Sequence, residues 1–151
     1  MRVVIQRVSK ASVSIEGKIH SAIKKGILVL LGVENEDNQQ DIEWLVKKIS
    51  QLRIFEDGNG VMNLSVKDVD GDVIVVSQFT LHASTKKGNR PSYIKAARPE
   101  ISIPLYEAFI KEMEATLGKQ VGTGKFGAMM DVSLVNNGPV TIIIDSKNKD
   151  L

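Results

Sequence analysis

A short polar motif, Ser77-Gln78-Phe79-Thr80, follows the apolar run Val73–Val76 and is the first place where this chain could do chemistry. Its hydroxyls, its amide and the backbone N–H groups could bind a carbonyl oxygen and an ammonium group without a strong base. The apolar run predicts a buried strand, and the end of such a strand holds side chains in fixed positions. The alternative is a strand end whose hydroxyls only cap neighbouring backbone, and the residues alone favour that alternative.

No familiar catalytic set accompanies this motif. The chain has no nucleophile elbow, no phosphate-binding glycine loop and no zinc-binding histidine pair on a helix. In an extended segment Thr80 and His82 would share one face, opposite Phe79 and Leu81. A threonine nucleophile needs an activating base. Because no group that would orient His82 can be named, Thr80 is interpreted as a substrate binder before a nucleophile.

The composition excludes several other classes of site. The chain has no cysteine and only two distant histidines, His20 and His82, so disulfides and cysteine-ligated zinc are excluded and no metal or cofactor is expected. Its 151 residues, 42% of them hydrophobic, predict one domain over residues 1–151 with a polar tail at about 146–151. The longest apolar run, Ile27–Leu31, is too short to cross a bilayer, and a cytoplasmic protein is expected.

Two further segments could bind a ligand. The motif Asn136-Asn137-Gly138-Pro139-Val140-Thr141 lies between two apolar runs and would alone be a turn that opens the last strand, where proline is tolerated. The window Val73–Pro99 contains no acidic residue. Its basic residues are Lys86, Lys87, Arg90, Lys95 and Arg98. A segment of one charge sign indicates either an anionic ligand nearby or a solvated loop.

The elements around these motifs predict a mixed α/β fold of roughly eight strands and two helices. The strand patterns are Val3–Val8, Ala11–Ile15, Ile27–Val33, Val73–Gln78, Val121–Lys125, Met129–Val135 and Val140–Asp145, with turns at Glu16–Lys18, Asp57–Gly60 and Asp70–Asp72. Helical spacing predicts one helix over Asp37–Gln51, capped by Asp37 or Asn38. A second helix is expected from an N-cap at Ser102, with Pro104 in its first turn, to Gly118. Strands without intervening helices at the start favour two packed β layers with helices on one side.

The motifs Ser77-Gln78-Phe79-Thr80 and Asn136-Asn137-Gly138-Pro139-Val140-Thr141, in this order, resemble those of the D-aminoacyl-tRNA deacylases, the D-tyrosyl-tRNA(Tyr) deacylase family. The resemblance runs from Met1 to about Ile144 and includes Ile5-Gln6-Arg7-Val8, Leu30-Leu31-Gly32-Val33, Arg90-Pro91-Ser92 and Val132-Ser133-Leu134-Val135. It implies a three-layer β/β/α sandwich that forms a homodimer. It also implies an enzyme that hydrolyses the ester bond of D-aminoacyl-tRNA, and glycyl-tRNA mischarged on tRNA(Ala) as well.

The resemblance further implies roles for the singled-out residues. The aminoacylated 3′ end of tRNA would lie at Ser77, Gln78, Phe79 and Thr80, with the ribose 2′-hydroxyl assisting and no obligatory protein base. The Gly138-Pro139 bond would be cis and would reach into the partner subunit's pocket. Two carbonyl oxygens there would reject an L side chain, and Asn136, Thr141 and Arg7 belong to the same selecting set.

Arg7 is open to two interpretations, a brace for this loop or an ordinary exposed strand arginine. Lys86, Lys87 and Arg90 are expected to contact tRNA phosphates. Two other functions stay open at this point. One is a non-catalytic RNA-binding module that uses the basic window, and the other is a general small-ester hydrolase with Thr80 as its nucleophile.

Overall fold

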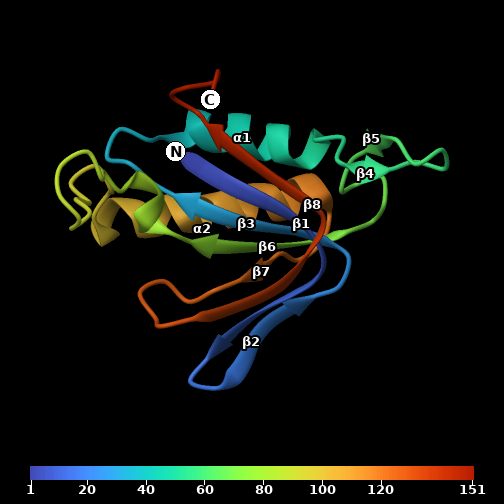
Figure 1. Ribbon diagram of the computed structural model, residues 1–151, viewed down its shortest axis with the longest axis horizontal. Coiled ribbons are helices and arrows are strands. Elements are labelled where there is room, and N and C mark those ends of the chain that lie inside the picture. The colour runs from blue at the N-terminus through green and yellow to red at the C-terminus, as the bar shows by residue number, and fades with distance from the viewer.

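The computed structural model describes residues 1–151 and has a mixed α/β fold, as predicted (Figure 1). A six-stranded sheet has the order β2-β1-β3-β6-β7, with β8 paired to β1, and a separate hairpin joins β4 to β5. The strands are β1 Arg2–Ile15, β2 Lys18–Ile23, β3 Gly26–Gly32, β4 Phe55–Glu56, β5 Met62–Leu64, β6 Asp72–Ser77, β7 Gly122–Thr123 and β8 Asp131–Asp145. The helices are α1 Gln39–Gln51, the 3₁₀ helix η1 Phe79–His82 and α2 Pro99–Leu117.

Strands β1 and β8 are each continuous where the sequence predicted two shorter strands. They pair antiparallel from Arg2 opposite Asp145 to Ser14 opposite Asp131, with register shifts near the middle. Bulges absorb the extra residues there, so the local turn signal bends the strand instead of ending it. Because Gln6 pairs with Thr141 and Val8 with Asn136, Arg7 alone faces residues 137–140 of β8.

Both helices follow from local signals, although α2 begins earlier than predicted. Asn38 caps α1, since its side chain accepts a hydrogen bond from the Gln40 N–H and the Asp41 carboxylate accepts one from the Asn38 N–H. The N-cap of α2 is Arg98 and not Ser102. Pro99 occupies the first helical position, where a missing N–H costs nothing, and Pro104 therefore lies inside the helix.

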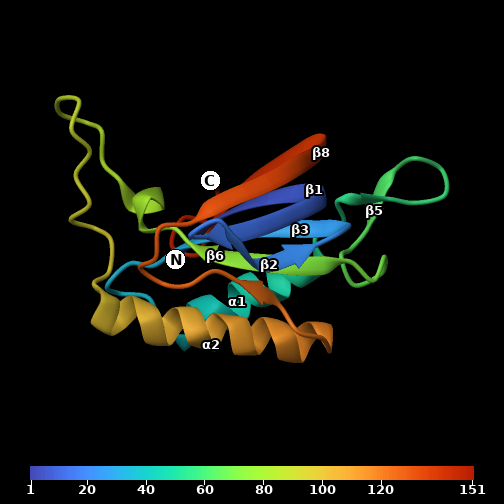
Figure 2. The ribbon, with the colours of Figure 1, turned by 90° about the horizontal axis from the view of Figure 1, so that it is seen from below.

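The alternating side chains of β6 separate two apolar clusters. Val73 and Val75 belong to a large core that includes Leu45 of α1 and Phe109 of α2. Their neighbours Ile74 and Val76 face a smaller cluster that contains Val8, Val13 and Leu28. The helices cover one face of the sheet (Figure 2). Strands buried on both faces hold their ends rigidly, and β6 is the strand that ends at the polar motif. Neither helix is long and apolar enough to cross a membrane.

Candidate functional site

The polar motif lies where β6 ends and the chain turns into η1. Ser77 is paired with Leu31 of β3, and the Gln78 N–H donates to the Leu31 carbonyl at 2.8 Å. The prediction of an extended segment after Ser77 is wrong, because residues 79–82 form a 3₁₀ turn. Gly32 makes room for it: a Cβ on this glycine would lie 3.0 Å from Leu81 Cβ and 3.1 Å from the Gln78 carbonyl oxygen.

Side chains on this turn point to binding and not to a histidine-activated nucleophile. The Gln78 amide donates to Thr80 Oγ1. His82 is buried, its Nδ1 lies 3.0 Å from a Glu34 carboxylate oxygen, and its Nε2 has no hydrogen-bond partner. No hydrogen bond joins His82 to Thr80. The threonine hydroxyl therefore contacts a neutral amide, which cannot activate it as a base would.

An apolar hollow of about 610 Å³ opens beside the motif. Ser77, Gln78, Phe79, Tyr93 and Met129 are among its lining residues. The rings of Phe79 and Tyr93 meet edge to face, with centroids 5.0 Å apart and planes at 74°. Phe79 is 52% exposed and Met129 is 89% exposed, so this apolar surface faces solvent in the single chain. Exposed apolar surface of this kind marks a binding or association site.

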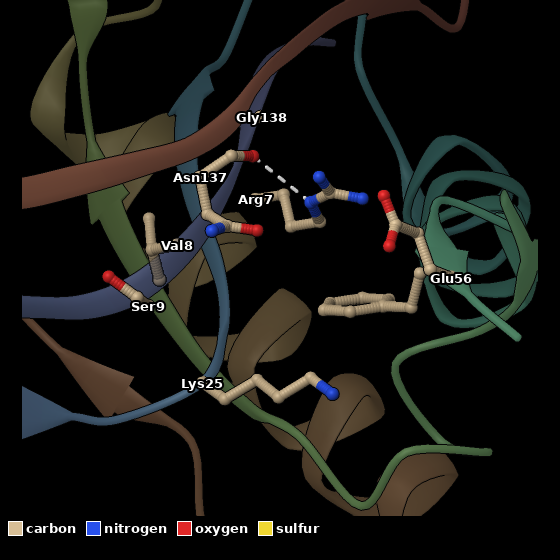
Figure 3. Close-up of a pocket in the computed structure, with 8 residues that line it drawn as sticks. Arg7, Val8, Ser9, Lys25, Glu56, Asn137 and Gly138 are labelled. Atoms are coloured by element: carbon tan, nitrogen blue, oxygen red, sulfur yellow. Dashed lines mark hydrogen bonds between the residues drawn. The ribbon is translucent and has the colours of Figure 1, made fainter. Parts of the chain in front are cut away.

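The second motif is a bulge of β8 held in place by Arg7. The Gly138-Pro139 bond is cis, as the resemblance implied. Arg7 is only 6% exposed, and its Nε donates to the Asn137 carbonyl at 3.0 Å (Figure 3). Its Nη1 donates to the Ile54 carbonyl at 2.7 Å. The interpretation of Arg7 as an exposed strand arginine is wrong. Arg7 lies in a hollow of about 530 Å³ that Lys25, Glu56 and Gly138 also line.

Asn136 and Thr141 close the base of this bulge. The Asn136 amide donates to Thr141 Oγ1 at 3.0 Å, and its carbonyl oxygen accepts from the Val140 N–H at 3.1 Å. Gln6 adds a further contact to Thr141 Oγ1 at 3.3 Å. These bonds fix both ends of the bulge, so the Gly138-Pro139 segment between them is a rigid projection.

Within one chain the two motifs lie at opposite ends of the sheet. Arg7, which braces the bulge, pairs with Ile27 at the start of β3, whereas Ser77 pairs with Leu31 near its end. Four residues of strand separate the two positions, roughly 13 Å. The bend of β8 lies at one end of the sheet in Figure 1 and the loop after η1 at the other. The structure thus does not assemble all the predicted site residues in a single protomer.

The part of the basic window that follows η1, residues 83–98, forms a projecting loop (Figure 2). Ser84 and Ser92 bridge its base through two backbone hydrogen bonds of 2.8 and 2.9 Å. Lys86, Lys87 and Arg90 are exposed on it, and none of them forms an ion pair. The loop places free positive charge at the same end of the sheet as Ser77–Thr80.

Two residues that contact the turn after Ser77, Arg2 and Glu34, were not predicted from the sequence. Arg2 bonds the Leu81 carbonyl at 2.9 Å and pairs with Asp145, and Glu34 contacts His82. Burial alone would raise the pKa of Asp145, but hydrogen bonds from the Lys147 N–H and from Arg2 outweigh it and lower the pKa. No sequence signal links these positions, because each contact spans dozens of residues. No group of three or more acidic or histidine side chains lies together as a metal site requires.

The chain matches known proteins over nearly its whole length. The family model described as D-Tyr-tRNA(Tyr) deacylase matches residues 4–145. Proteins named D-aminoacyl-tRNA deacylase are 68% identical in Flavobacterium psychrophilum and 65% identical in Bacteroides fragilis, each over 99% of this chain and 100% of the relative.

Two solved structures have the same fold. One, titled c-Myc DNA Unwinding Element Binding Protein, is 42% identical with a TM-score of 0.90 over 96% of this chain and 98% of its own. The other, titled as a probable eukaryotic D-amino acid tRNA deacylase, is 16% identical with a TM-score of 0.81 over 95% of this chain and 97% of its own. The resemblance found in the sequence is confirmed: the chain belongs to the D-Tyr-tRNA(Tyr) deacylase family and is an enzyme of that family.

Proposed function

We propose that this enzyme hydrolyses the ester bond of D-aminoacyl-tRNA, and of glycyl-tRNA mischarged on tRNA(Ala), and releases the free amino acid and tRNA. The observation that carries the proposal is the end-to-end match to relatives named D-aminoacyl-tRNA deacylase. The site geometry supports it, since an open apolar hollow adjoins a cluster of hydroxyl, amide and backbone groups. We assign the enzyme to the cytoplasm, where charged tRNA is used.

The aminoacyl ester is an activated bond, so its hydrolysis requires positioning and stabilisation of the oxyanion more than a strong base. Phe79 and Thr80 begin η1, and their N–H groups therefore have no partner inside that short helix. Held at the end of a buried strand, these donors would stabilise the developing oxyanion, and losing one such donor typically costs ~100- to 1000-fold in rate. Ser77, Gln78 and the Thr80 hydroxyl orient the substrate, while the ribose 2′-hydroxyl orients water.

Selection for the D configuration would come from a second subunit. Gly138 and Pro139 lie too far from Ser77–Thr80 to act on a substrate in the same protomer. We therefore propose a homodimer in which the bulge of one protomer enters the partner's hollow, where Phe79 and Met129 are exposed in the single chain. Its carbonyl oxygens would face the substrate's α-carbon and obstruct an L side chain, whereas a D side chain would point away. Glycine, which has no side chain, would pass the same filter.

The proposed dimer builds on one domain over residues 1–151 with a three-layer β/β/α arrangement. The two apolar clusters on opposite faces of β6 support the three layers. The tail after Asp145 is bound through Lys147, whose Nζ lies 2.9 Å from Asp41. On the outside of the dimer, Lys86, Lys87 and Arg90 would bind phosphates of the tRNA near its 3′ end.

Deacylation of D-tyrosyl-tRNA, L-tyrosyl-tRNA and a simple tyrosyl ester by the purified protein tests the proposal. We expect cleavage of the D substrate alone. Equal cleavage of the simple ester would indicate a general hydrolase, and tRNA binding without cleavage would indicate a binding module. Either outcome would replace the proposed function.

A further inference from the structure

Helix α1 carries a basic surface that the proposed site does not use. Trp44 lies at its centre, half-buried, with Lys48 Nζ 5.7 Å and Lys149 Nζ 4.7 Å from the centroid of its ring. Lys47 and Arg53 line the adjoining shallow hollow of about 440 Å³. We call Trp44, Lys47, Lys48, Arg53 and Lys149 the α1 basic surface.

The cations of this surface form no ion pairs within the chain. The ion pairs of the fold involve the N-terminal amine, Arg2, His82, Lys119 and Lys147, and none of the four cations of the α1 basic surface. Asp41, on the same helix, is already paired with Lys147.

Two details show how these cations are held. Arg53 uses Nε to bond the Asn63 carbonyl at 3.0 Å and forms no ion pair with a carboxylate. Lys149 reaches the Trp44 ring from the end of the chain, so the tail and the helix contribute to one surface.

From this arrangement we infer that the α1 basic surface binds the phosphate backbone of the tRNA away from its 3′ end. The inference rests on the proposed function, which supplies a polyanion as the substrate. Cations grouped around an aromatic ring suit a phosphate backbone, because each ammonium contacts a phosphate while the ring contacts sugar or base. The site at Ser77–Thr80 would read the ester, and this surface would add affinity for the body of the tRNA.

Its position in the fold is compatible with a tRNA bound at the proposed site. Strand β3 ends beside Ser77, and α1 begins seven residues after Gly32 at the same end of the sheet. Trp44 lies about 8 Å along the helix axis from that start, at 1.5 Å per residue. The Ala97 N–H bonds the Val33 carbonyl at 2.8 Å, so the basic window returns to the segment that leads into α1.

The two basic surfaces are separate contacts. The segment between β3 and α1 carries Glu34 and Glu36 and would repel a phosphate backbone laid directly across it. A tRNA would therefore contact the loop of Lys86, Lys87 and Arg90 near its end, and the α1 basic surface farther along. Removing one set leaves the other able to bind, which makes the contributions measurable independently.

A triple variant, Lys47→Ala/Lys48→Ala/Lys149→Ala, tests the inference. Its matched control is Lys18→Ala/Lys67→Ala/Lys111→Ala, which removes the same charge from exposed, unpaired lysines elsewhere. Two quantities are measured for each: affinity for uncharged tRNA across a salt series, and kcat/KM on full-length D-tyrosyl-tRNA and on a short D-tyrosyl RNA ending in CCA. The short substrate reaches the proposed site without reaching α1.

For the α1 variant we expect tRNA affinity to fall about tenfold at low salt. The plot of log affinity against log salt should become less steep by about two units, because each lost phosphate contact removes roughly 0.7 unit of slope. Cleavage of full-length D-tyrosyl-tRNA should fall with it, whereas cleavage of the short substrate and the control variant should not change. Parental tRNA affinity and salt slope would overturn the inference and leave an acidic protein as the occupant of the surface.

An equal loss on both substrates would also overturn the inference, because it would indicate damage to the site. The same holds for an equal loss in the control variant, which would indicate a general charge effect. If the wild-type enzyme cleaves neither substrate, the proposed function fails, and binding of uncharged tRNA still decides the role of the α1 basic surface.

Discussion

The Arg7 guanidinium bonds the carbonyl oxygen of Asn137, the residue directly before Gly138. The same side chain bonds the Ile54 carbonyl, so one buried cation ties the bulge of β8 to the segment that follows α1. The position of Gly138 and Pro139 therefore depends on a residue that need not touch substrate. Selectivity in the proposed dimer should be sensitive to this brace.

Replacing Arg7 with methionine should loosen the bulge. It leaves two carbonyl oxygens without their donor, which costs about 1–3 kcal/mol of unfolding free energy for each buried group left unsatisfied. We expect lower urea resistance and a lower ratio of D- to L-tyrosyl-tRNA cleavage. Ser9→Ala is the control, since Ser9 lines the same hollow but its side chain forms no hydrogen bond to the bulge. An unchanged ratio in Arg7→Met would show that the brace has no part in selection.

Thr80→Ala should weaken cleavage without abolishing it. The hydroxyl forms its one hydrogen bond with the Gln78 amide, so we expect its loss to remove a positioning group and not a nucleophile. Rates on D-tyrosyl-tRNA, with mass spectrometry of the quenched enzyme, check this. An acyl group trapped on Thr80 would contradict the proposed mechanism.

A tRNA that lacks the terminal 2′-hydroxyl should be a much poorer substrate. Equal cleavage rates for the two tRNAs would show that this hydroxyl has no part in the reaction.

The loop after η1 should contribute affinity for tRNA at the 3′ end. In the variant Lys86→Ala/Lys87→Ala/Arg90→Ala we expect a higher KM on both full-length and short substrates. The salt slope should fall by roughly 0.7–0.9 unit for each lost phosphate contact. A salt series of kcat/KM measures both effects. A parental salt slope would mean that the loop is solvated surface and nothing more.

We expect the buried hydroxyl of Tyr106 to make the free energy of unfolding fall at alkaline pH. Its hydroxyl bonds the Val75 carbonyl of β6 at 2.8 Å, and burial raises its pKa to about 12. The unfolded value is near 10. Because the folded pKa is the higher one, this stabilisation is complete below pH ~10 and is lost as the pH rises toward ~12.

Urea unfolding between pH 9 and 12 should therefore show a steeper loss in the wild type than in Tyr106→Phe. The variant should also be about 1 kcal/mol less stable at neutral pH, because it lacks the hydrogen bond. Tyr93→Phe, at a half-exposed ring, is the control and should keep the parental slope. Identical slopes for wild type and Tyr106→Phe would contradict the assignment.

Local signals in the sequence predicted the elements that depend on local physics. The predicted strand Val73–Gln78 closely matches β6. The predicted helix Asp37–Gln51 matches α1, and of its two candidate caps, Asp37 and Asn38, the second is the cap. Prediction was less accurate where pairing decides the outcome. The joining of two strands into β8 depends on its partner β1 along its whole length, which no local pattern reveals.

In the site, too, local sequence predicted the residue types but not the contacts between distant residues. The residue types at Ser77–Thr80 indicated binding chemistry, but the 3₁₀ turn depends on Gly32, a residue on another strand. The brace by Arg7 joins residues 130 positions apart in the sequence. Distance along β3 separates the two motifs within a protomer, and only the strand register reveals it.

Gly138→Ala should damage both the fold and the proposed site. Gly138 has a φ of 129°, a backbone conformation that L side chains rarely adopt, and its new Cβ would lie 2.8 Å from Arg7 Nη2 and 2.9 Å from Val140 Cγ2. Strain of this kind costs about 1–3 kcal/mol, and relieving it would shift the bulge or displace Arg7. Either shift moves the carbonyl oxygens that the proposed dimer places against the substrate's α-carbon.

We therefore expect Gly138→Ala to lose both urea resistance and most of its activity on D-tyrosyl-tRNA. Gly58→Ala is the matched control, since a Cβ there meets no atom within 4 Å. Mixed dimers separate the two effects. A protomer with Gly138→Ala and an intact Ser77–Thr80 motif, paired with a partner carrying Gln78→Ala, should regain one working site. That site would combine the normal bulge of the second subunit with the normal motif of the first. No recovery in mixed dimers would mean that the bulge acts within its own protomer, against the distance along β3.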